Sequence, residues 1–342
     1  MSLRAALERA VQGEEIPAAV LEAAFGEIIE GKASPIAIAA LLVALRTKGE
    51  TPGEIVAVAR ALRARAVLAP CVDPRTVDTC GTGGDGVGSF NISTAAAFVV
   101  AGAGVPVAKH GNRAATSRAG SIDVLEALGV RADLPVATSA RILERVGIAP
   151  FFARRAHPAM RYVAPVRQEL GVRTLMNCLG PLLNPVGVKR QLVGVYAAGL
   201  VATLATALGA LGAERALVVH GEDGLDEITT TAKTRASLLD GGQLTELVLD
   251  AAELGLPRAR LEDLCGGDAR ENAMMVRAVL SGEPGPRRDI VVLNAAAALW
   301  VAGAARGLAE GLVVARESID SGAASARLAF LVRATAEAQD GA

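Results

Sequence analysis

Five glycines lie between Gly81 and Gly88, in the segment Val77-Asp-Thr-Cys-Gly-Thr-Gly-Gly-Asp-Gly-Val-Gly-Ser-Phe-Asn-Ile-Ser-Thr-Ala-Ala-Ala-Phe-Val-Val100. They follow a short run, Thr76 to Thr79, that can end a strand, and they precede an apolar run that can open a helix. Glycine lets backbone N–H groups turn inward without a Cβ in the way, and a helix N-terminus adds partial positive charge. This order favours a phosphate-binding loop, and the alternative is a flexible connection between two elements.

The glycine loop matches neither of two common nucleotide motifs. No Gly-Lys-Ser/Thr closes it as in a Walker loop, and the glycine spacing is a poor dinucleotide-binding fingerprint. Another kind of phosphate chemistry is therefore indicated.

Composition describes an ordinary globular chain of 342 residues, with 51% hydrophobic and 21% charged residues, large enough for one large domain or two unequal ones. The net charge of −1 gives no reason to expect nucleic acid or a membrane surface as a partner. The four cysteines lack Cys-x-x-Cys spacing, which argues against a zinc site and a disulfide framework. We expect a cytoplasmic protein without an export signal or a membrane span.

The first 66 residues predict helices only. Apolar residues recur at helical spacing in Leu3 to Val11, Val20 to Ile29 and Ile36 to Leu45. Thr51-Pro-Gly-Glu54 supplies an N-cap, an N1 proline and an N3 acid before a fourth helix. These helices form either a separate lobe, a dimerisation surface or a plain cap on the larger domain.

After Pro74 the pattern changes to strand, loop and helix. Such alternation predicts an α/β fold with a mainly parallel central sheet covered by helices. The chain from Asp268 to Ala338 is predicted to be helical again. The expected domains are 1–70, all-helical and joined by a later segment near 168–188, and 71–342, the α/β domain. Candidate strands are Thr76–Thr79, Val105–Lys109, Ile148–Phe152, Gln191–Val195, Ala216–His220 and Ala236–Leu239.

Polar residues follow several of these strands, where parallel sheets bind their ligands. Lys109-His-Gly-Asn-Arg113 ends one strand and leads to Ser121, the predicted start of a helix, and its alternative is a solvated polar loop. Arg167 carries a donor fork suited to a carboxylate, although most helical arginines lie on the surface. Asp226-Glu227 is suited to Mg²⁺ or is a solvated acidic turn.

Taken together, these motifs resemble the anthranilate phosphoribosyltransferase family over essentially the whole chain. The matching segments run in the family's order and include Gly81-Thr-Gly-Gly-Asp85, Asn91-Ile-Ser-Thr94, Lys109-His-Gly-Asn-Arg113, His157-Pro-Ala-Met160, Pro165-Val-Arg167, Arg173-Thr174, Asn177-Cys-Leu-Gly-Pro-Leu-Leu-Asn-Pro185 and Asp226-Glu227-Ile228. Each motif is weak alone, and the ordered set is specific.

The resemblance implies a pentosyl-transferring enzyme of tryptophan biosynthesis that joins phosphoribose, from phosphoribosyl diphosphate (PRPP), to the amine of anthranilate. It also implies a homodimer through the helical domain and two Mg²⁺ per monomer, with no general base. The implied metal ligands are Ser93, Asp226 and Glu227, and the implied anthranilate residues are Gly81, Asn112, Arg167, His110 and Pro181. The implied PRPP residues are Gly81, Gly84, Asp85, Ser89, Asn91, Ile92, Ser93, Thr94, Lys109, Gly111, Asn112, Arg113, Ser117 and Ser121.

Two other functions also fit parts of the sequence. A pyrimidine nucleoside phosphorylase is similar in topology and glycine loop, but it would need neither Arg167 nor the segment Asn177 to Pro185. A non-enzymatic relative with a nucleic-acid surface should carry a basic groove, which a neutral chain with Asp226-Glu227 does not favour.

Overall fold

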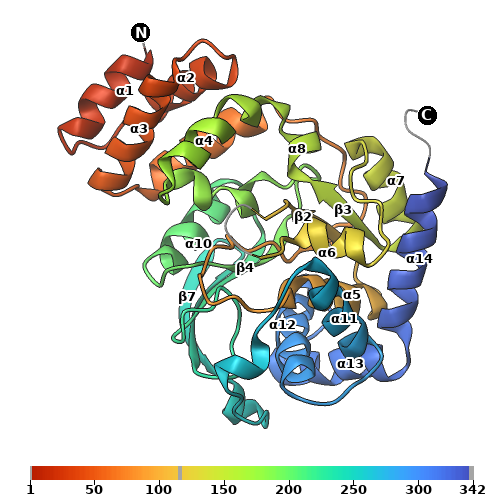
Figure 1. The fold of residues 1–342 in the computed structure, drawn as a ribbon. Coiled ribbons are helices and arrows are strands. Elements are labelled where there is room, and N and C mark those ends of the chain that lie inside the picture. Colours follow the sequence, from red (N-terminus) through yellow and green to blue (C-terminus); the bar gives the residue numbers. More distant parts are fainter. Residues whose placement is uncertain (1, 115–117, 339–342) are drawn as a thin grey trace.

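The computed structural model describes residues 2–114 and 118–338. Four helices form an N-terminal unit, at the upper left in Figure 1, as the apolar spacing predicts. No helix within the described ranges is both long and apolar enough to cross a membrane. The four helices are α1 (Ser2–Val11), α2 (Ala18–Ile29), α3 (Pro35–Lys48) and α4 (Pro52–Arg63).

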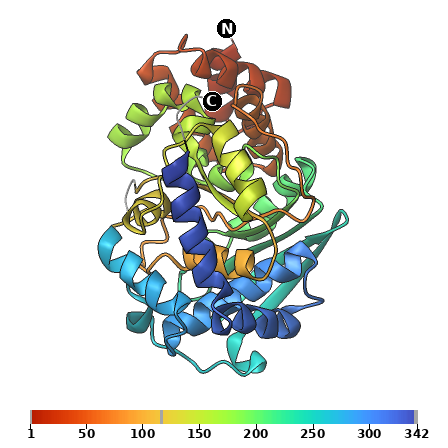
Figure 2. The same ribbon diagram turned by 90° about the vertical axis from the view of Figure 1, so that its right-hand side faces the viewer.

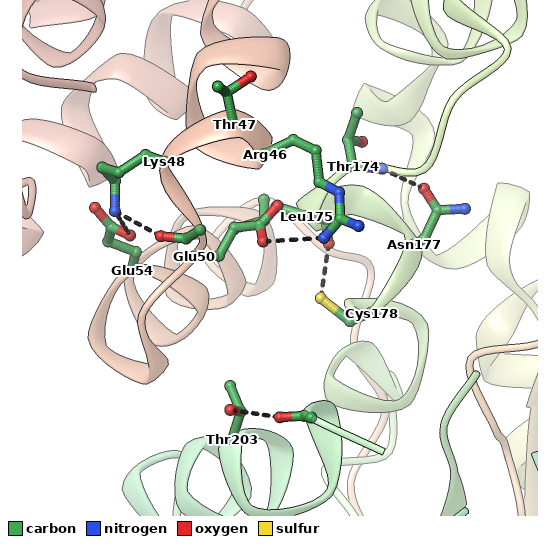
Figure 3. A network of polar contacts seen from close by, with 12 residues as sticks. Arg46, Thr47, Lys48, Glu50, Glu54, Thr174, Leu175, Asn177, Cys178 and Thr203 are labelled. Carbon is green, nitrogen blue, oxygen red and sulfur yellow. Dashed lines mark hydrogen bonds and ion pairs between the residues drawn. The ribbon is translucent and has the colours of Figure 1, made fainter. Parts of the chain in front are cut away.

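The start of α4 confirms the predicted capping motif and adds a buried ion pair. Thr51 and Glu54 form a capping box, in which the Glu54 N–H donates to Thr51 Oγ1 at 3.2 Å. Lys48 Nζ donates to Glu54 Oε2 at 2.8 Å, and the two side chains are 5% and 0% exposed. The other carboxylate oxygen accepts the Ile16 N–H at 3.0 Å. Figure 3 shows Lys48 pointing at Glu54 and, beside them, Arg46 extending toward the turn that contains Cys178.

The sheet has seven strands in the order β3-β2-β1-β4-β5-β6-β7, and the first five in this order run parallel. The predicted mainly parallel sheet is thus confirmed. The strand expected at Ala236–Leu239 is longer and antiparallel, and it forms a hairpin with β7, which was not among the expected strands. The strands are β1 (Val77–Asp78), β2 (Val107–Gly111), β3 (Ile148–Phe152), β4 (Arg190–Gly194), β5 (Arg215–Gly221), β6 (Lys233–Asp240) and β7 (Gln243–Asp250).

Helices cover both faces of the sheet. On one face the apolar helix α5 packs against four helices near the C-terminus, which are drawn in blue in Figure 2. On the other face α10 packs against α4 of the N-terminal unit. The remaining helices are α5 (Ile92–Gly102), α6 (Ser121–Ala127), α7 (Val136–Val146), α8 (Ala153–Ala156), α9 (Ala164–Leu170), α10 (Leu200–Ala210), α11 (Ala269–Leu280), α12 (Pro286–Ala302), α13 (Leu308–Asp320) and α14 (Ala323–Glu337).

Side chains of strands β4 and β5 contribute to two hydrophobic cores. Val193 and Val218 pack with the N-terminal helices, whereas Leu192 and Leu217 pack toward the C-terminal helices. This division follows from side chains alternating across a strand. The 3-10 turns are η1 (Pro158–Tyr162), η2 (Leu175–Asn177), η3 (Gly180–Leu183), η4 (Ala251–Leu254) and η5 (Leu261–Leu264).

Replacing Glu54 by alanine should strongly destabilise the protein, because the buried Lys48 would lose its anionic partner and keep only its hydrogen bond to the Gly49 carbonyl at 2.8 Å. Breaking such a buried pair costs about 3 to 5 kcal/mol. Thermal unfolding of Glu54→Ala measures this loss. Glu8→Ala is the matched control, since the Arg4–Glu8 pair is 86% and 59% exposed and should contribute under about 0.5 kcal/mol. Equal melting temperatures for the two variants would contradict the assignment.

Candidate active site

The glycine loop follows β1 at the carboxyl edge of the sheet. Four of its glycines, Gly83, Gly84, Gly86 and Gly88, have φ between 65° and 81°. This left-handed backbone is costly for residues with a side chain. The shape of the loop therefore requires glycine at these positions. The loop has a defined backbone conformation, unlike a flexible connection.

Gly81 is needed for a different reason, the close approach of neighbouring segments. A Cβ at this position would lie 3.0 Å from Asp226 Oδ2 and 3.0 Å from the Gly194 carbonyl oxygen. A Cβ on Gly194, the last residue of β4, would overlap the Asp226 carbonyl. The loops after β1 and β5 thus meet over the end of β4, as expected for motifs at one sheet edge.

The acidic pair is bound into the site. Asp226 Oδ2 accepts the Gly83 N–H at 2.8 Å, and Glu227 Oε1 accepts the Ser93 N–H at 3.1 Å. Burial, followed by the nearby Asp85, raises the pKa of Asp226 to about 7. Burial and Asp226 also raise the pKa of Glu227 well above its usual value. These contacts differ from those of a fully solvated acidic turn.

The residues around this pair fit a hard divalent cation. Asp85 Oδ2 is buried and has no hydrogen-bond partner among the described residues, although Oδ1 accepts the Val87 N–H at 3.1 Å. Asp226 and Glu227 have raised pKa values, and Asp85 has an oxygen without a hydrogen-bond donor from the residues that the structure describes. Carboxylate oxygens such as these are the ligands that Mg²⁺ prefers. Another group, formed by Asp78, Cys80 and His110, has ligand atoms within 4.8 Å of one another. It is less suited, since both Asp78 oxygens already accept hydrogen bonds, from the His110 N–H and Asn184 Nδ2.

Lys109 projects from β2 into the same region. Its ammonium, in a side chain that is 4% exposed, donates to the Thr79 carbonyl at 3.1 Å and to Ser93 Oγ at 3.4 Å. The side chain therefore joins the end of β1 to the first turn of α5. A buried cation beside a glycine loop and a helix N-terminus favours an anionic ligand.

The loop after β2 is only partly in the expected arrangement. Asn112 is exposed, and Ser121 begins α6 as predicted, with its hydroxyl where a Cβ on Gly111 would lie. Arg113 does not face the glycine loop: it pairs with Glu126 at 2.8 Å and lies over the Phe152 ring at 5.3 Å. Ser117 lies outside the described residues.

The residues expected to bind the aromatic substrate lie on separate elements. Pro181, buried in η3, accepts Gln191 Nε2 through its carbonyl at 2.7 Å. Arg167, on α9, is half-buried, and its guanidinium makes no hydrogen bond or ion pair with the described residues. Burial lowers its pKa from the usual value. Such a guanidinium lacks a carboxylate partner within the described part of the chain.

Two histidines lie in contact near η3. His110 Nδ1 lies 3.0 Å from the Gly180 carbonyl and His157 Nε2 lies 2.7 Å from the Leu183 carbonyl, so each of these nitrogens carries a hydrogen and donates a hydrogen bond. The rings meet edge to face, with centroids 5.7 Å apart. Burial and the neighbouring His157 lower the pKa of His110 to about 3, which keeps it neutral.

The segment after α9 touches the glycine loop directly. Arg173 donates from Nη2 to the Gly84 carbonyl and lies over the Tyr196 ring at 4.6 Å. Arg173 was expected only as part of a matching motif, and no contact with the glycine loop was predicted for it. Asp78, Asn272 and Asn294 were also missed, although a polar residue inside the apolar run Leu293-Asn-Ala-Ala-Ala-Ala-Leu299 was a signal for Asn294.

Comparison with known proteins agrees with this architecture. The family models "Glycosyl transferase family, helical bundle domain" and "Glycosyl transferase family, a/b domain" match residues 4–66 and 73–325. An anthranilate phosphoribosyltransferase of Rubrobacter xylanophilus is 55% identical over 334 residues, which cover 97% of each chain.

Solved structures give the same result. An anthranilate phosphoribosyltransferase of Thermus thermophilus superposes with a TM-score of 0.92 at 45% identity, covering 97% of this chain and 99% of that one. The enzyme of Saccharomyces cerevisiae, solved in complex with PRPP and Mg, has a TM-score of 0.90 at 27% identity, with 98% of each chain covered. Because similarity at this level extends over nearly the full length, the chain belongs to the anthranilate phosphoribosyltransferase family.

Proposed function

We propose that this chain transfers the phosphoribosyl group of PRPP to the amine of anthranilate, giving N-(5-phosphoribosyl)anthranilate and diphosphate in tryptophan biosynthesis. The observation that carries this proposal is the meeting of the glycine loop, the buried Lys109 and the pair Asp226-Glu227 at one sheet edge. Family membership supplies the substrates.

Binding of PRPP rests on the glycine loop, the first turn of α5 and the loop after β2. Backbone N–H groups and the Lys109 ammonium would neutralise the diphosphate, which is the leaving group. The proposed residues are Gly81, Gly84, Asp85, Ser89, Asn91, Ile92, Ser93, Thr94, Lys109, Gly111, Asn112, Ser117 and Ser121. Arg113 joins this set only if it leaves Glu126.

Ser93, Asp226 and Glu227 are the proposed ligands of Mg²⁺, with two ions per monomer. A bound divalent cation supplies charge stabilisation to the departing diphosphate. The orphaned Asp85 oxygen and the raised pKa values of the acidic pair support this assignment.

Anthranilate is proposed to contact Gly81, Asn112, Arg167, His110 and Pro181. The Arg167 guanidinium, which has no partner among the described residues, would donate two parallel hydrogen bonds to the substrate carboxylate. An arylamine attacks as a neutral base, so no general base is assigned, and a neutral His110 agrees with that choice. The reaction is followed by incubating the protein with anthranilate, PRPP and Mg²⁺ and recording anthranilate fluorescence. No loss of fluorescence with folded protein would refute the proposal.

We also propose that the chain divides into a helical domain, residues 1–70, and an α/β domain, residues 71–342. The helical domain is proposed to form the interface of a homodimer. Ile36 and Val43 lie seven residues apart on α3 and are 81% and 41% exposed, and Val11 at the end of α1 is 72% exposed. Exposed apolar side chains on α1 and α3, two helices that pack against each other, favour association. A cytoplasmic location fits the four free cysteines.

Removing the acidic pair should abolish magnesium-dependent turnover while the fold persists. Asp226→Asn with Glu227→Gln is expected to lower kcat/KM at least about a hundredfold, because metal ligands contribute several kcal/mol to the transition state. Glu222→Gln, an exposed acid of the same loop, is the control and should keep normal rates. Unchanged activity of the double variant would disprove the ligand assignment.

Arg167 should affect one substrate and not the other. Arg167→Ala is expected to lower kcat/KM for anthranilate roughly ten- to a hundredfold, since a charge-assisted pair is worth about 1.5 to 3 kcal/mol. Arg167→Lys should fall between, because it keeps the charge and loses the fork. The apparent KM for PRPP should change little, and the exposed Arg161→Ala should change neither constant. Equal losses for both substrates would withdraw Arg167 from the anthranilate site.

Charges on the exposed face of α3 should dissociate the dimer. Ile36→Glu combined with Val43→Glu is expected to convert the protein to a monomer, as seen by size-exclusion chromatography with light scattering. Val313→Glu is the control, because Val313 is 62% exposed on α13 in the C-terminal part of the chain. A double variant that stays dimeric would locate the interface elsewhere.

A further inference from the structure

Two asparagines are buried in the helices near the C-terminus, outside the residues assigned to the site. Asn272 on α11 is 2% exposed and Asn294 on α12 is 0% exposed. A buried amide is costly unless its donors and acceptor are all bonded. Each side chain has at least one partner in the segments that build the site.

Asn294 binds the backbone beside the acidic pair. Its Oδ1 accepts the Ile228 N–H at 3.0 Å, and its Nδ2 donates to the Ile228 carbonyl at 2.8 Å. A further bond from Nδ2 to the Ile290 carbonyl, 2.9 Å long, fixes the amide to its own helix. Ile228 follows Glu227 directly, so Asn294 fixes the peptide that carries the proposed metal ligands.

Asn272 holds the other half of the site. Its Nδ2 donates to Asn91 Oδ1 at 2.8 Å, and its Oδ1 accepts the Gly267 N–H at 2.7 Å. Asn91 is the N-cap of α5, yet its side chain makes no capping bond there. The first turn of α5 consequently keeps its N–H groups for other partners, of which the Ser93 N–H donates to Glu227.

These bonds form a closed arrangement around the phosphate and metal region. Asn272 holds the start of α5, Asn294 holds the peptide after Glu227, and the Ser93–Glu227 hydrogen bond joins the two. The helices that carry the two amides, α11 and α12, pack against each other and against α5. Side chains that orient metal ligands in this way typically change metal affinity 10- to 100-fold when removed.

We propose that Asn272 and Asn294 are positioning residues that set the distance between the first turn of α5 and the metal-binding acids. This inference rests on the proposed function. Asn294 governs the metal side of the site and Asn272 the PRPP side.

The test compares Asn294→Ala and Asn272→Ala with Ser318→Ala. Ser318 is the matched control: it is 3% exposed on α13, and its hydroxyl donates to the Val99 carbonyl of α5 at 2.7 Å, away from the first turn. Mn²⁺ binding in the presence of PRPP is measured by electron paramagnetic resonance, and PRPP binding with Mg²⁺ by calorimetry. Melting temperatures are recorded in parallel.

All three variants are expected to melt at lower temperature, because each loses a buried hydrogen bond. Asn294→Ala should weaken Mn²⁺ binding about tenfold and Asn272→Ala should weaken PRPP binding about tenfold, whereas Ser318→Ala should change neither. If Asn294→Ala does not fold, Asn294→Asp takes its place, since it keeps the acceptor for the Ile228 N–H and loses the donor.

Unchanged Mn²⁺ and PRPP affinities in both asparagine variants would overturn the proposal, and the side chains would then be structural only. Equal weakening in Ser318→Ala would overturn it as well. If the unaltered protein binds no PRPP, the proposed function itself is wrong and the inference falls with it.

Discussion

The site depends on the close approach of backbone at Gly81, Gly194 and Asp226. Strand β4 separates β1 from β5 in the sheet, so the loops after β1 and β5 can meet only by passing over the end of β4. Gly194 at that end has no side chain to block the passage. Gly81 also lacks a side chain, which leaves room for the Asp226 carboxylate beside it. The hydrogen bonds from Gly83 and Ser93 to the acidic pair follow from this contact.

The fold was largely predictable because its signals are local. Apolar spacing and the Thr51 cap define α4, and the alternation of strand and helix identifies the parallel strands. The hairpin partner β7 was missed, since most of its residues are exposed and only Leu247 and Leu249 pack against the core. The direction of β6 also depends on its pairing with β5, which a strand pattern does not specify.

The site was predictable as a set of loops and less so as a set of contacts. Lys109 was expected near the site because it ends a strand at the edge where parallel sheets bind ligands, whereas the metal role of Asp226-Glu227 was expected from the family resemblance. The pairing of Arg113 with Glu126 depends on how α6 packs, and the sequence motif does not specify that packing. Asn272 and Asn294 act across 181 and 66 residues of sequence, where only the folded chain brings the partners together.

Helix α5 is enclosed by segments that arrive late in synthesis. It ends at Gly102, is almost wholly buried, and contacts α11, α12, α13 and α14, the last of which begins at Ala323. Ribosomes add about 5 to 20 residues per second, so this apolar helix stays incompletely covered for roughly ten to forty seconds in each nascent chain. During that interval it offers chaperones a binding segment, and a chain that ends before α11 leaves it permanently open to aggregation.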